Sequence, residues 1–147
     1  MSFIVRYAGW EDLQALLDLY THLNDNKPTQ IDERVESVWR SMLSRPNQYI
    51  LLGDENGQIV SSLSLTIISS LTHGQRPFAV IEYVVTHSEH RGNGYAGKLI
   101  EKAEEIAKSR NCYKIMLITG HKEESVHKLY KKCGFSSEGK TAYVKEI

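Results

Sequence analysis

The glycine-rich residues 91–96 carry the clearest chemical signal in this sequence. They read Arg-Gly-Asn-Gly-Tyr-Ala and lie between an apolar segment, residues 78–85, and an amphipathic helical pattern. Small residues let a ligand approach the backbone closely, and the free N–H groups of a helix start attract anions. The segment therefore predicts a phosphate cradle formed by Arg91, Gly92, Asn93, Gly94, Tyr95 and Ala96. The alternative is a strand-to-helix turn that merely needs glycine.

A single carboxylate interrupts the apolar segment that leads to this turn. Glu82 lies among apolar neighbours, and the alternation of a strand predicts Val80 and Val84 on the same face. A carboxylate there costs free energy unless it is paired or faces a cleft. In a cleft it suits a general base that accepts a proton from an ammonium nucleophile. The alternative is a buried ion pair with Arg76 or Lys114.

A second candidate lies near the end of the last predicted helix, residues 123–133. Tyr130 shares one helical face with apolar residues and is followed by Lys-Lys-Cys-Gly-Phe. Its hydroxyl is either a proton donor or a core group that caps the backbone.

Two segments together resemble the GNAT superfamily, the acetyl-CoA-dependent N-acyltransferases. Arg91, Gly94 and Ala96 fit the Arg-x-x-Gly-x-Ala pattern of its pyrophosphate loop, and residues 129–135 resemble its later signature. The resemblance covers nearly the whole chain and is strongest from residue 81 to residue 135. The chain is also similar in part to the glucosamine-6-phosphate N-acetyltransferase branch, although Tyr83 stands where that branch has aspartate.

The resemblance implies roles for several residues, with acetyl-CoA as the co-substrate and direct transfer to an amine. The pantetheine arm pairs with the backbone of Val84, Val85 and Thr86, one amide of which stabilises the oxyanion. Glu82 is the general base, and Tyr130 protonates the leaving thiolate. Asn24, Asp25 and Tyr83 are expected on the acceptor side. The resemblance also implies a homodimer, in which a last strand at residues 141–144 is the element to exchange or pair between subunits.

Composition narrows the classes of partner. The 147 residues carry 18 basic and 18 acidic side chains, which argues against a nucleic-acid or membrane-surface partner. No apolar run approaches the roughly 20 residues that span a bilayer, and the N-terminus lacks a signal-peptide layout. The six histidines show no metal-ligand spacing, so no metal is expected, and the two cysteines fit reduced packing residues. These features predict a cytoplasmic protein with a single domain, residues 1–147.

The hydrophobic pattern predicts the elements that position these residues. Their order is β-α-α-β-β-β-α-β-α-β, an α/β fold with a mixed, mostly antiparallel sheet and helices on both faces. The strands are expected at residues 3–7, 49–52, 58–69, 78–86, 113–119 and 135–144, and the helices at residues 10–24, 35–43, 96–108 and 123–133. The glycine segment then lies at the carboxyl end of a central strand, where such sheets form ligand sites.

Three functions fit the sequence. The first is an N-acetyltransferase acting on a primary amine of a small molecule. The others are a non-catalytic acyl-CoA-binding sensor and a protein or peptide acetyltransferase. Glu82 and Tyr130 discriminate between the enzyme and the sensor, because a pure binder needs neither.

Overall fold

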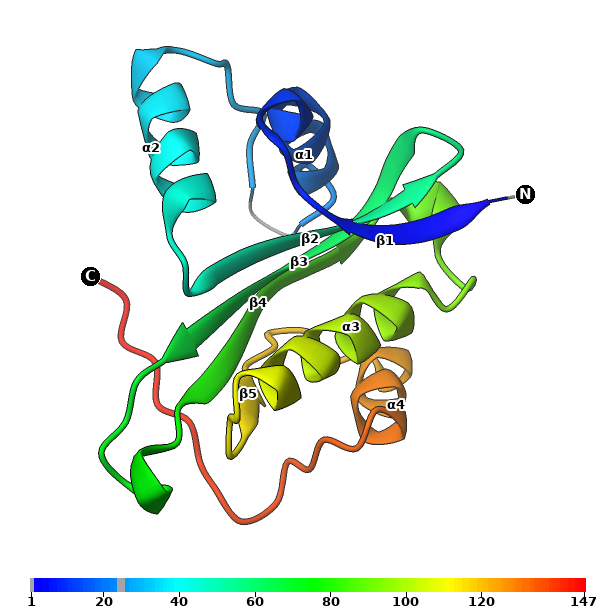
Figure 1. Ribbon diagram of the computed structural model, residues 1–147. Coiled ribbons are helices and arrows are strands. Elements are labelled where there is room, and N and C mark those ends of the chain that lie inside the picture. The colour runs from blue at the N-terminus through cyan, green and yellow to red at the C-terminus, as the bar shows by residue number, and fades with distance from the viewer. Residues whose placement is uncertain (1, 24–25) are drawn as a thin grey trace.

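A five-stranded sheet with the strand order β1-β2-β3-β4-β5 runs through the molecule (Figure 1). The computed structural model describes residues 2–23 and 26–147. The first four strands pair antiparallel and β5 pairs parallel with β4. The strands are β1 (Phe3–Tyr7), β2 (Gln48–Glu55), β3 (Gln58–Ile68), β4 (Phe78–Thr86) and β5 (Ile115–Leu117). This confirms the expected mixed α/β fold.

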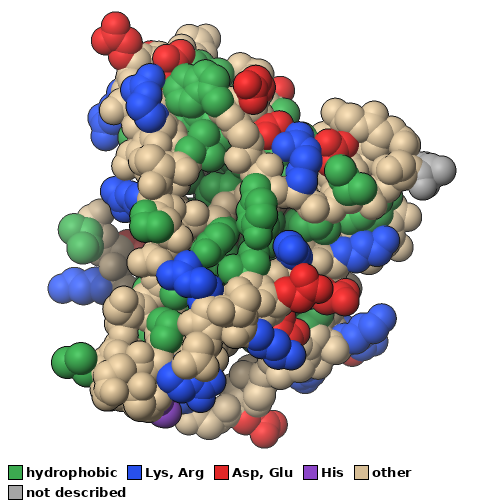
Figure 2. Space-filling model, viewed as in Figure 1, with side chains coloured by type: hydrophobic (Ala, Val, Ile, Leu, Met, Phe, Trp, Pro, Cys, Tyr) green, Lys and Arg blue, Asp and Glu red, His purple; other side chains and the backbone are tan. Residues whose placement is uncertain are grey.

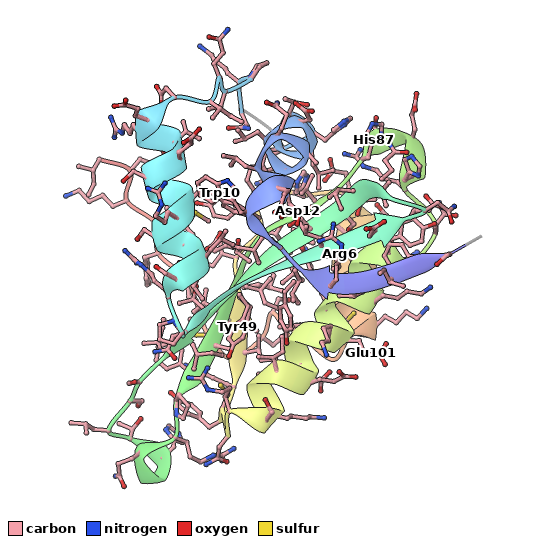
Figure 3. The ribbon with its side chains drawn as sticks, turned by 45° about the horizontal axis from the view of Figure 1, so that its top comes forward. Arg6, Trp10, Asp12, Tyr49, His87 and Glu101 are labelled. Carbon is pink, nitrogen blue, oxygen red and sulfur yellow. The ribbon has the colours of Figure 1, made fainter. Side chains whose placement is uncertain are left out.

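Helices α1 (Leu13–Tyr20) and α2 (Glu33–Ser44) cover one face of the sheet. A short 3₁₀ turn, η1 (Trp10–Asp12), precedes α1, and the Asp32 carboxylate caps α2 by accepting the Val35 N–H at 2.9 Å. Three sheet residues, Ile50, Leu52 and Val85, are buried against these helices in one apolar cluster. Arg6 of β1 ties the layer to the sheet, because it donates to Asp12 at 2.8 Å and to Asp54 at 3.0 Å (Figure 3).

The longest helix, α3 (Tyr95–Ser109), covers the opposite face, and α4 (Glu124–Lys132) lies beside it. Leu99, Ile100 and Ala103 of α3 are buried against Ile81 of β4 and Leu65 of β3. The apolar stripe predicted for this helix is therefore its buried face. After α4, Gly134 adopts φ +92° and Phe135 N–H donates back to Tyr130 O at 3.0 Å, which is a glycine cap that ends the helix.

One expected element is not formed. The segment predicted as a last strand, residues 135–144, has no strand conformation, so the element order ends at α4. Its apolar side chains are exposed, with Tyr143 at 93% and Val144 at 70%. Gly139 at φ +89° turns the chain within the segment. Alternating residues favour a strand, but a strand also needs pairing with a sheet edge, and within the described residues this segment pairs with none of the five strands.

None of the helices in residues 2–23 and 26–147 is long and apolar enough to cross a membrane.

Candidate active site

A bulge in β4 determines how the candidate catalytic strand presents its side chains. Ser62 pairs with Val85 and Ser64 pairs with Glu82, so two β4 residues, Tyr83 and Val84, oppose one residue of β3. Tyr83 adopts φ +56°, which is uncommon for a residue other than glycine. The bulge shifts the alternation by one residue. Val84 therefore packs against the α3-side cluster together with Ile81, and the expectation that it shares a face with Glu82 was wrong.

The same strand loses its neighbour beyond the bulge. β5 pairs only with residues Ala79, Val80 and Ile81, so in the described part of the chain residues 82–86 have no strand beside them on that edge. The backbone of Val84, Val85 and Thr86, predicted to pair with a pantetheine arm, lies in this opening. Part of it is already used, because the Thr86 carbonyl accepts the Arg91 Nε–H at 3.2 Å.

The chain then turns through η3 (Ser88–His90) into the glycine segment. His87, labelled in Figure 3, accepts the Glu89 N–H at 3.1 Å, and its ring packs at a tilt of 42° against that of His22, with ring centroids 4.1 Å apart. Burial lowers the pKa of His22, with the neighbouring His87 and Arg91 acting in the same direction. The end of α1 thus supports the start of the loop.

The glycine segment presents free donors at the start of α3. Gly92 and Gly94 adopt φ +83° and φ +76°, and a Cβ at either position would meet open space. The first N–H to bond in this helix is that of Lys98, which donates to Gly94 O at 3.2 Å. The N–H groups of Gly94, Tyr95, Ala96 and Gly97 donate to no residue within the described ranges. An open cradle with unused amides fits a diphosphate. The N–H of Gly97 is a further donor, which the predicted cradle of residues 91–96 did not include.

Glu82 is exposed on the face covered by α1 and α2. Its backbone pairs with Ser64 of β3, but its carboxylate makes no hydrogen bond or ion pair with any residue that the structure describes. Neither partner considered for it is free: Arg76 donates to the carbonyls of Asn111 and Cys112, and the Lys114 ammonium lies 5.3 Å from the Phe78 ring centroid. The buried ion pair is therefore not formed.

Tyr83 lies next to Glu82 on the same side, because of the bulge. Its ring centroid is 6.1 Å from that of Tyr20, at the end of α1. The other two residues expected on the acceptor side, Asn24 and Asp25, lie outside the described residues.

Tyr130 packs partly buried against the α3-side core, with its ring edge-on to Phe135 at 6.2 Å. Burial raises the pKa of its hydroxyl, and the nearby Cys133 thiol adds to the effect. The hydroxyl makes no hydrogen bond to a residue of the described chain, so it does not cap the backbone there. A phenol held protonated in this way can donate a proton.

Sequence reasoning missed one charged residue beside the loop. Glu55, the last residue of β2, is only 9% exposed and lies within hydrogen-bond distance of His90 and Tyr95, which flank residues 91–94. It is 35 and 40 residues from these partners, so no local pattern signals the contact.

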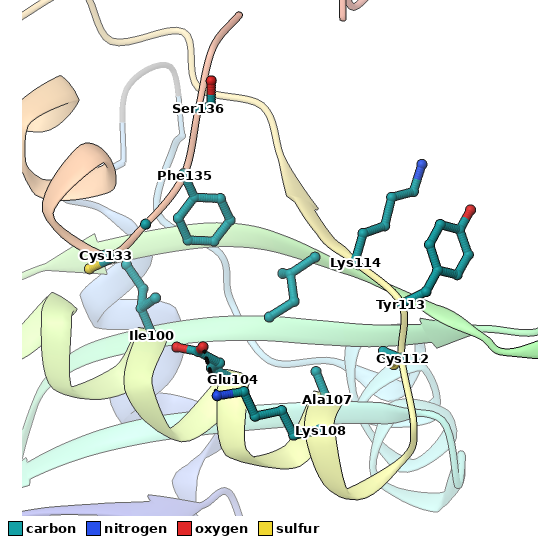
Figure 4. Close-up of a pocket in the computed structure, with 12 residues that line it drawn as sticks. Ile100, Glu104, Ala107, Lys108, Cys112, Tyr113, Lys114, Cys133, Phe135 and Ser136 are labelled. Carbon is teal, nitrogen blue, oxygen red and sulfur yellow. Dashed lines mark ion pairs between the residues drawn. The ribbon is translucent and has the colours of Figure 1, made fainter. Parts of the chain in front are cut away.

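Two cavities lie near the site without containing Glu82 or the free amides. One, of about 360 Å³, lies between α3, β5 and the segment after α4, and Figure 4 shows Glu104 paired with Lys108 at its wall, at 3.2 Å. The other, of about 220 Å³, is an apolar groove between α1 and α2 that includes Tyr20. Figure 2 shows hydrophobic side chains gathered on this side of the molecule.

Comparison with known proteins defines the class as an acyltransferase. The model of the Acetyltransferase (GNAT) family matches residues 11–135, and the chain belongs to that family. The resemblance seen in the sequence is thereby confirmed. Members of the family use acetyl-CoA as the acetyl donor.

Three similar proteins illustrate the match. Glucosamine 6-phosphate N-acetyltransferase of Trypanosoma brucei brucei is 32% identical over 131 residues, which are 89% of this chain and 87% of the relative. A putative acetyltransferase structure from Agrobacterium tumefaciens is 38% identical, with a TM-score of 0.89 and coverage of 97% and 99%. A predicted acetyltransferase with acetyl-CoA from Clostridium acetobutylicum shares the fold, with a TM-score of 0.77, 21% identity and coverage of 98% and 96%.

Proposed function

We propose that this chain is an N-acetyltransferase that moves the acetyl group of acetyl-CoA to a primary amine of a small molecule. The observation that carries the proposal is the placement of free amides at residues 94–97, one turn beyond the strand that bears the unpaired Glu82 carboxylate. A binding module would use the amides alone. The single domain of residues 1–147 would then hold both donor and acceptor in one ternary complex.

The diphosphate of the donor binds at the start of α3. Each charge-assisted hydrogen bond from a loop amide contributes about 1.5–3 kcal/mol. Gly92 and Gly94 leave the space beside these amides open, so phosphate oxygens can approach the backbone. The loop backbone of Arg91, Asn93 and Ala96 completes the cradle in this proposal.

The pantetheine arm lies along the open edge of β4, beside Val84, Val85 and Thr86. Acetyl-CoA supplies an activated acetyl group. One of the β4 amides donates to the carbonyl oxygen as negative charge develops on it, and a donor of this kind contributes about 3–4 kcal/mol.

Two side chains move the protons. Glu82 accepts the proton of the incoming ammonium, directly or through water, and its exposure on the α1–α2 face leaves it open to an acceptor. Tyr130 delivers a proton to the departing thiolate, and because burial raises its pKa the phenol is in its protonated form at neutral pH. The reaction needs no metal in this scheme.

The acceptor is proposed to lie against Tyr83 and the loop between α1 and α2, which includes Asn24 and Asp25. The Trypanosoma relative is named for an aminosugar phosphate, so a small polar amine is the first class to test.

Two further properties are part of the proposal. The exposed apolar residues Tyr143 and Val144 follow α4, and a second copy that pairs with residues 141–144 would cover them in a homodimer. Both cysteines are free, which fits a cytoplasmic location.

The test is release of free CoA from acetyl-CoA, measured against a panel of amines, aminosugars, amino acids and peptides. We expect release only with small primary amines. CoA binding without release with any acceptor would indicate a sensor, and release with peptides alone would indicate a protein acetyltransferase. Failure to bind CoA would refute the proposal.

A further inference from the structure

A buried carboxylate connects the two ends of the glycine segment. Glu55 Oε1 accepts the Tyr95 hydroxyl at 2.7 Å, and Glu55 Oε2 lies 2.8 Å from His90 Nδ1. His90 immediately precedes Arg91, and Tyr95 immediately follows Gly94. A single side chain from β2 therefore holds both flanks of the turn that presents the free amides.

The chemistry of this contact is well defined. An ionised carboxylate can only accept hydrogen bonds, so Nδ1 of His90 carries the proton in this pair. The Tyr95 hydrogen bond, with a further contribution from His90, holds the pKa of Glu55 below its ordinary value. The same contact raises the pKa of Tyr95. Both effects keep the Glu55 carboxylate ionised and the Tyr95 phenol protonated at neutral pH, as the hydrogen bond between them requires.

The Tyr95 side chain is fixed from its other side as well. Its ring stacks on Phe3 of β1, with centroids 3.9 Å apart and planes 3° from parallel. The Lys98 ammonium lies 5.1 Å from the centroid of the Phe3 ring. The Tyr95 side chain is therefore held in the interior, and Tyr95 contributes only its backbone to the loop.

His90 is fixed in a similar way through its backbone. Its N–H donates to His87 O at 2.8 Å, and its carbonyl accepts the Asn93 Nδ2–H at 2.9 Å. A shift of His90 would therefore be passed to Asn93, inside the loop.

We propose that Glu55 is a positioning residue for the diphosphate of the donor: by holding His90 and Tyr95 it keeps the amides of residues 94–97 convergent on one anion. The inference rests on the proposed function, because it assigns Glu55 to the donor side of that reaction. It touches no reacting atom, so its effect is confined to the part of the donor that the loop binds.

The test compares two acetyl donors. S-acetylpantetheine has the same thioester as acetyl-CoA but lacks the diphosphate. For Glu55→Ala we expect kcat/KM with acetyl-CoA to fall about 10- to 100-fold, mainly through KM, in line with the loss of one charge-assisted hydrogen bond. With S-acetylpantetheine, kcat/KM should change less than about twofold, since the loop is not used. Binding of CoA and of pantetheine, measured by calorimetry, should show the same difference.

Two further variants test the role of Glu55, and a third is a control. Glu55→Gln retains an acceptor for the Tyr95 hydroxyl and should restore part of the lost acetyl-CoA affinity. Tyr95→Phe keeps the ring on Phe3 and removes one hydrogen bond, so it tests the contact even where Glu55→Ala does not fold. Glu101→Ala removes an exposed carboxylate of α3 and should leave both donors unaffected.

The outcomes separate the two claims. If the wild-type protein binds no CoA, the proposed function and this inference both fall. If the wild type uses acetyl-CoA, but the folded variants lose activity equally with both donors, Glu55 serves only the stability of the fold and the inference is overturned while the proposed function stands. Unchanged affinity for CoA in Tyr95→Phe and in a folded Glu55→Ala would overturn it too.

Discussion

Substitution of Gly94 by alanine tests the anion cradle most directly. Gly94 has φ +76°, and a Cβ there meets no protein atom within 4 Å, so the added methyl causes backbone strain rather than a clash. A non-glycine residue in this conformation costs about 1–2 kcal/mol. For a chain of this size each kcal/mol shifts Tm by roughly 2–4 °C, so Tm should fall by about 2–8 °C.

The effect on ligand binding should be larger than the strain alone implies. The backbone either relaxes to negative φ and turns its amides away, or keeps its conformation with a methyl in the open space beside them. Losing one charge-assisted hydrogen bond to a phosphate costs about 1.5–3 kcal/mol, which corresponds to roughly a 10- to 100-fold rise in the Kd for CoA. Isothermal titration calorimetry measures this Kd, and differential scanning calorimetry measures Tm.

Gly57 offers a matched control. It turns the β2–β3 hairpin at φ +89°, and a Cβ there also meets nothing within 4 Å. Gly57→Ala should lower Tm to a similar extent and leave the CoA affinity unchanged. If Gly94→Ala lowers Tm like Gly57→Ala but binds CoA as the wild type does, the glycine segment is only a turn and the reasoning fails.

Four other predictions follow from the same structure. Glu82→Gln should lower kcat by about 10²- to 10⁴-fold with little change in CoA binding, and unchanged turnover would remove Glu82 from the mechanism. Tyr130→Phe should lower kcat most at neutral pH, where the raised pKa keeps the phenol protonated; equal rates across the pH range would contradict a role as acid. Saturation with CoA at one hundred times its Kd should stabilise the fold by about 2.7 kcal/mol, seen as a rise in Tm. Hydrogen bonding to Arg6 lowers the pKa of Asp12, so its stabilising contribution is complete above the unfolded pKa of about 4 and lost as pH falls through the folded pKa. Tm of the wild type should therefore fall more steeply below about pH 4 than Tm of Asp12→Asn, and parallel curves would refute this.

Local patterns predicted the elements around the loop well. The apolar segment at residues 78–86 is β4 with the same bounds, and the amphipathic pattern after the glycines is α3. Both depend on side chains a few residues apart, which the sequence displays directly. The positive φ of Gly94 and Gly134 follows from the same local logic, because glycine is the residue that adopts this conformation freely.

Features that depend on distant contacts were not predicted. The bulge occurs at Tyr83, a residue type that gives no sign of a positive φ, and it reversed the face expected for Val84. The contact between Glu55 and Tyr95 joins two elements through the folded sheet. The strand expected at residues 135–144 had a suitable pattern, but the edge needed to pair with it is a property of the assembled chain or of a second copy.

The conformation of Tyr83 also bears on how this enzyme would respond to selection for heat resistance. A tyrosine at φ +56° gives up stability that glycine or asparagine at the same position would recover. Screens that reward only a higher melting temperature should therefore favour those replacements, and they would remove the aromatic ring next to Glu82. If Tyr83 contacts the acceptor as proposed, such variants would gain stability and lose selectivity for the amine, a trade-off located at one residue of β4.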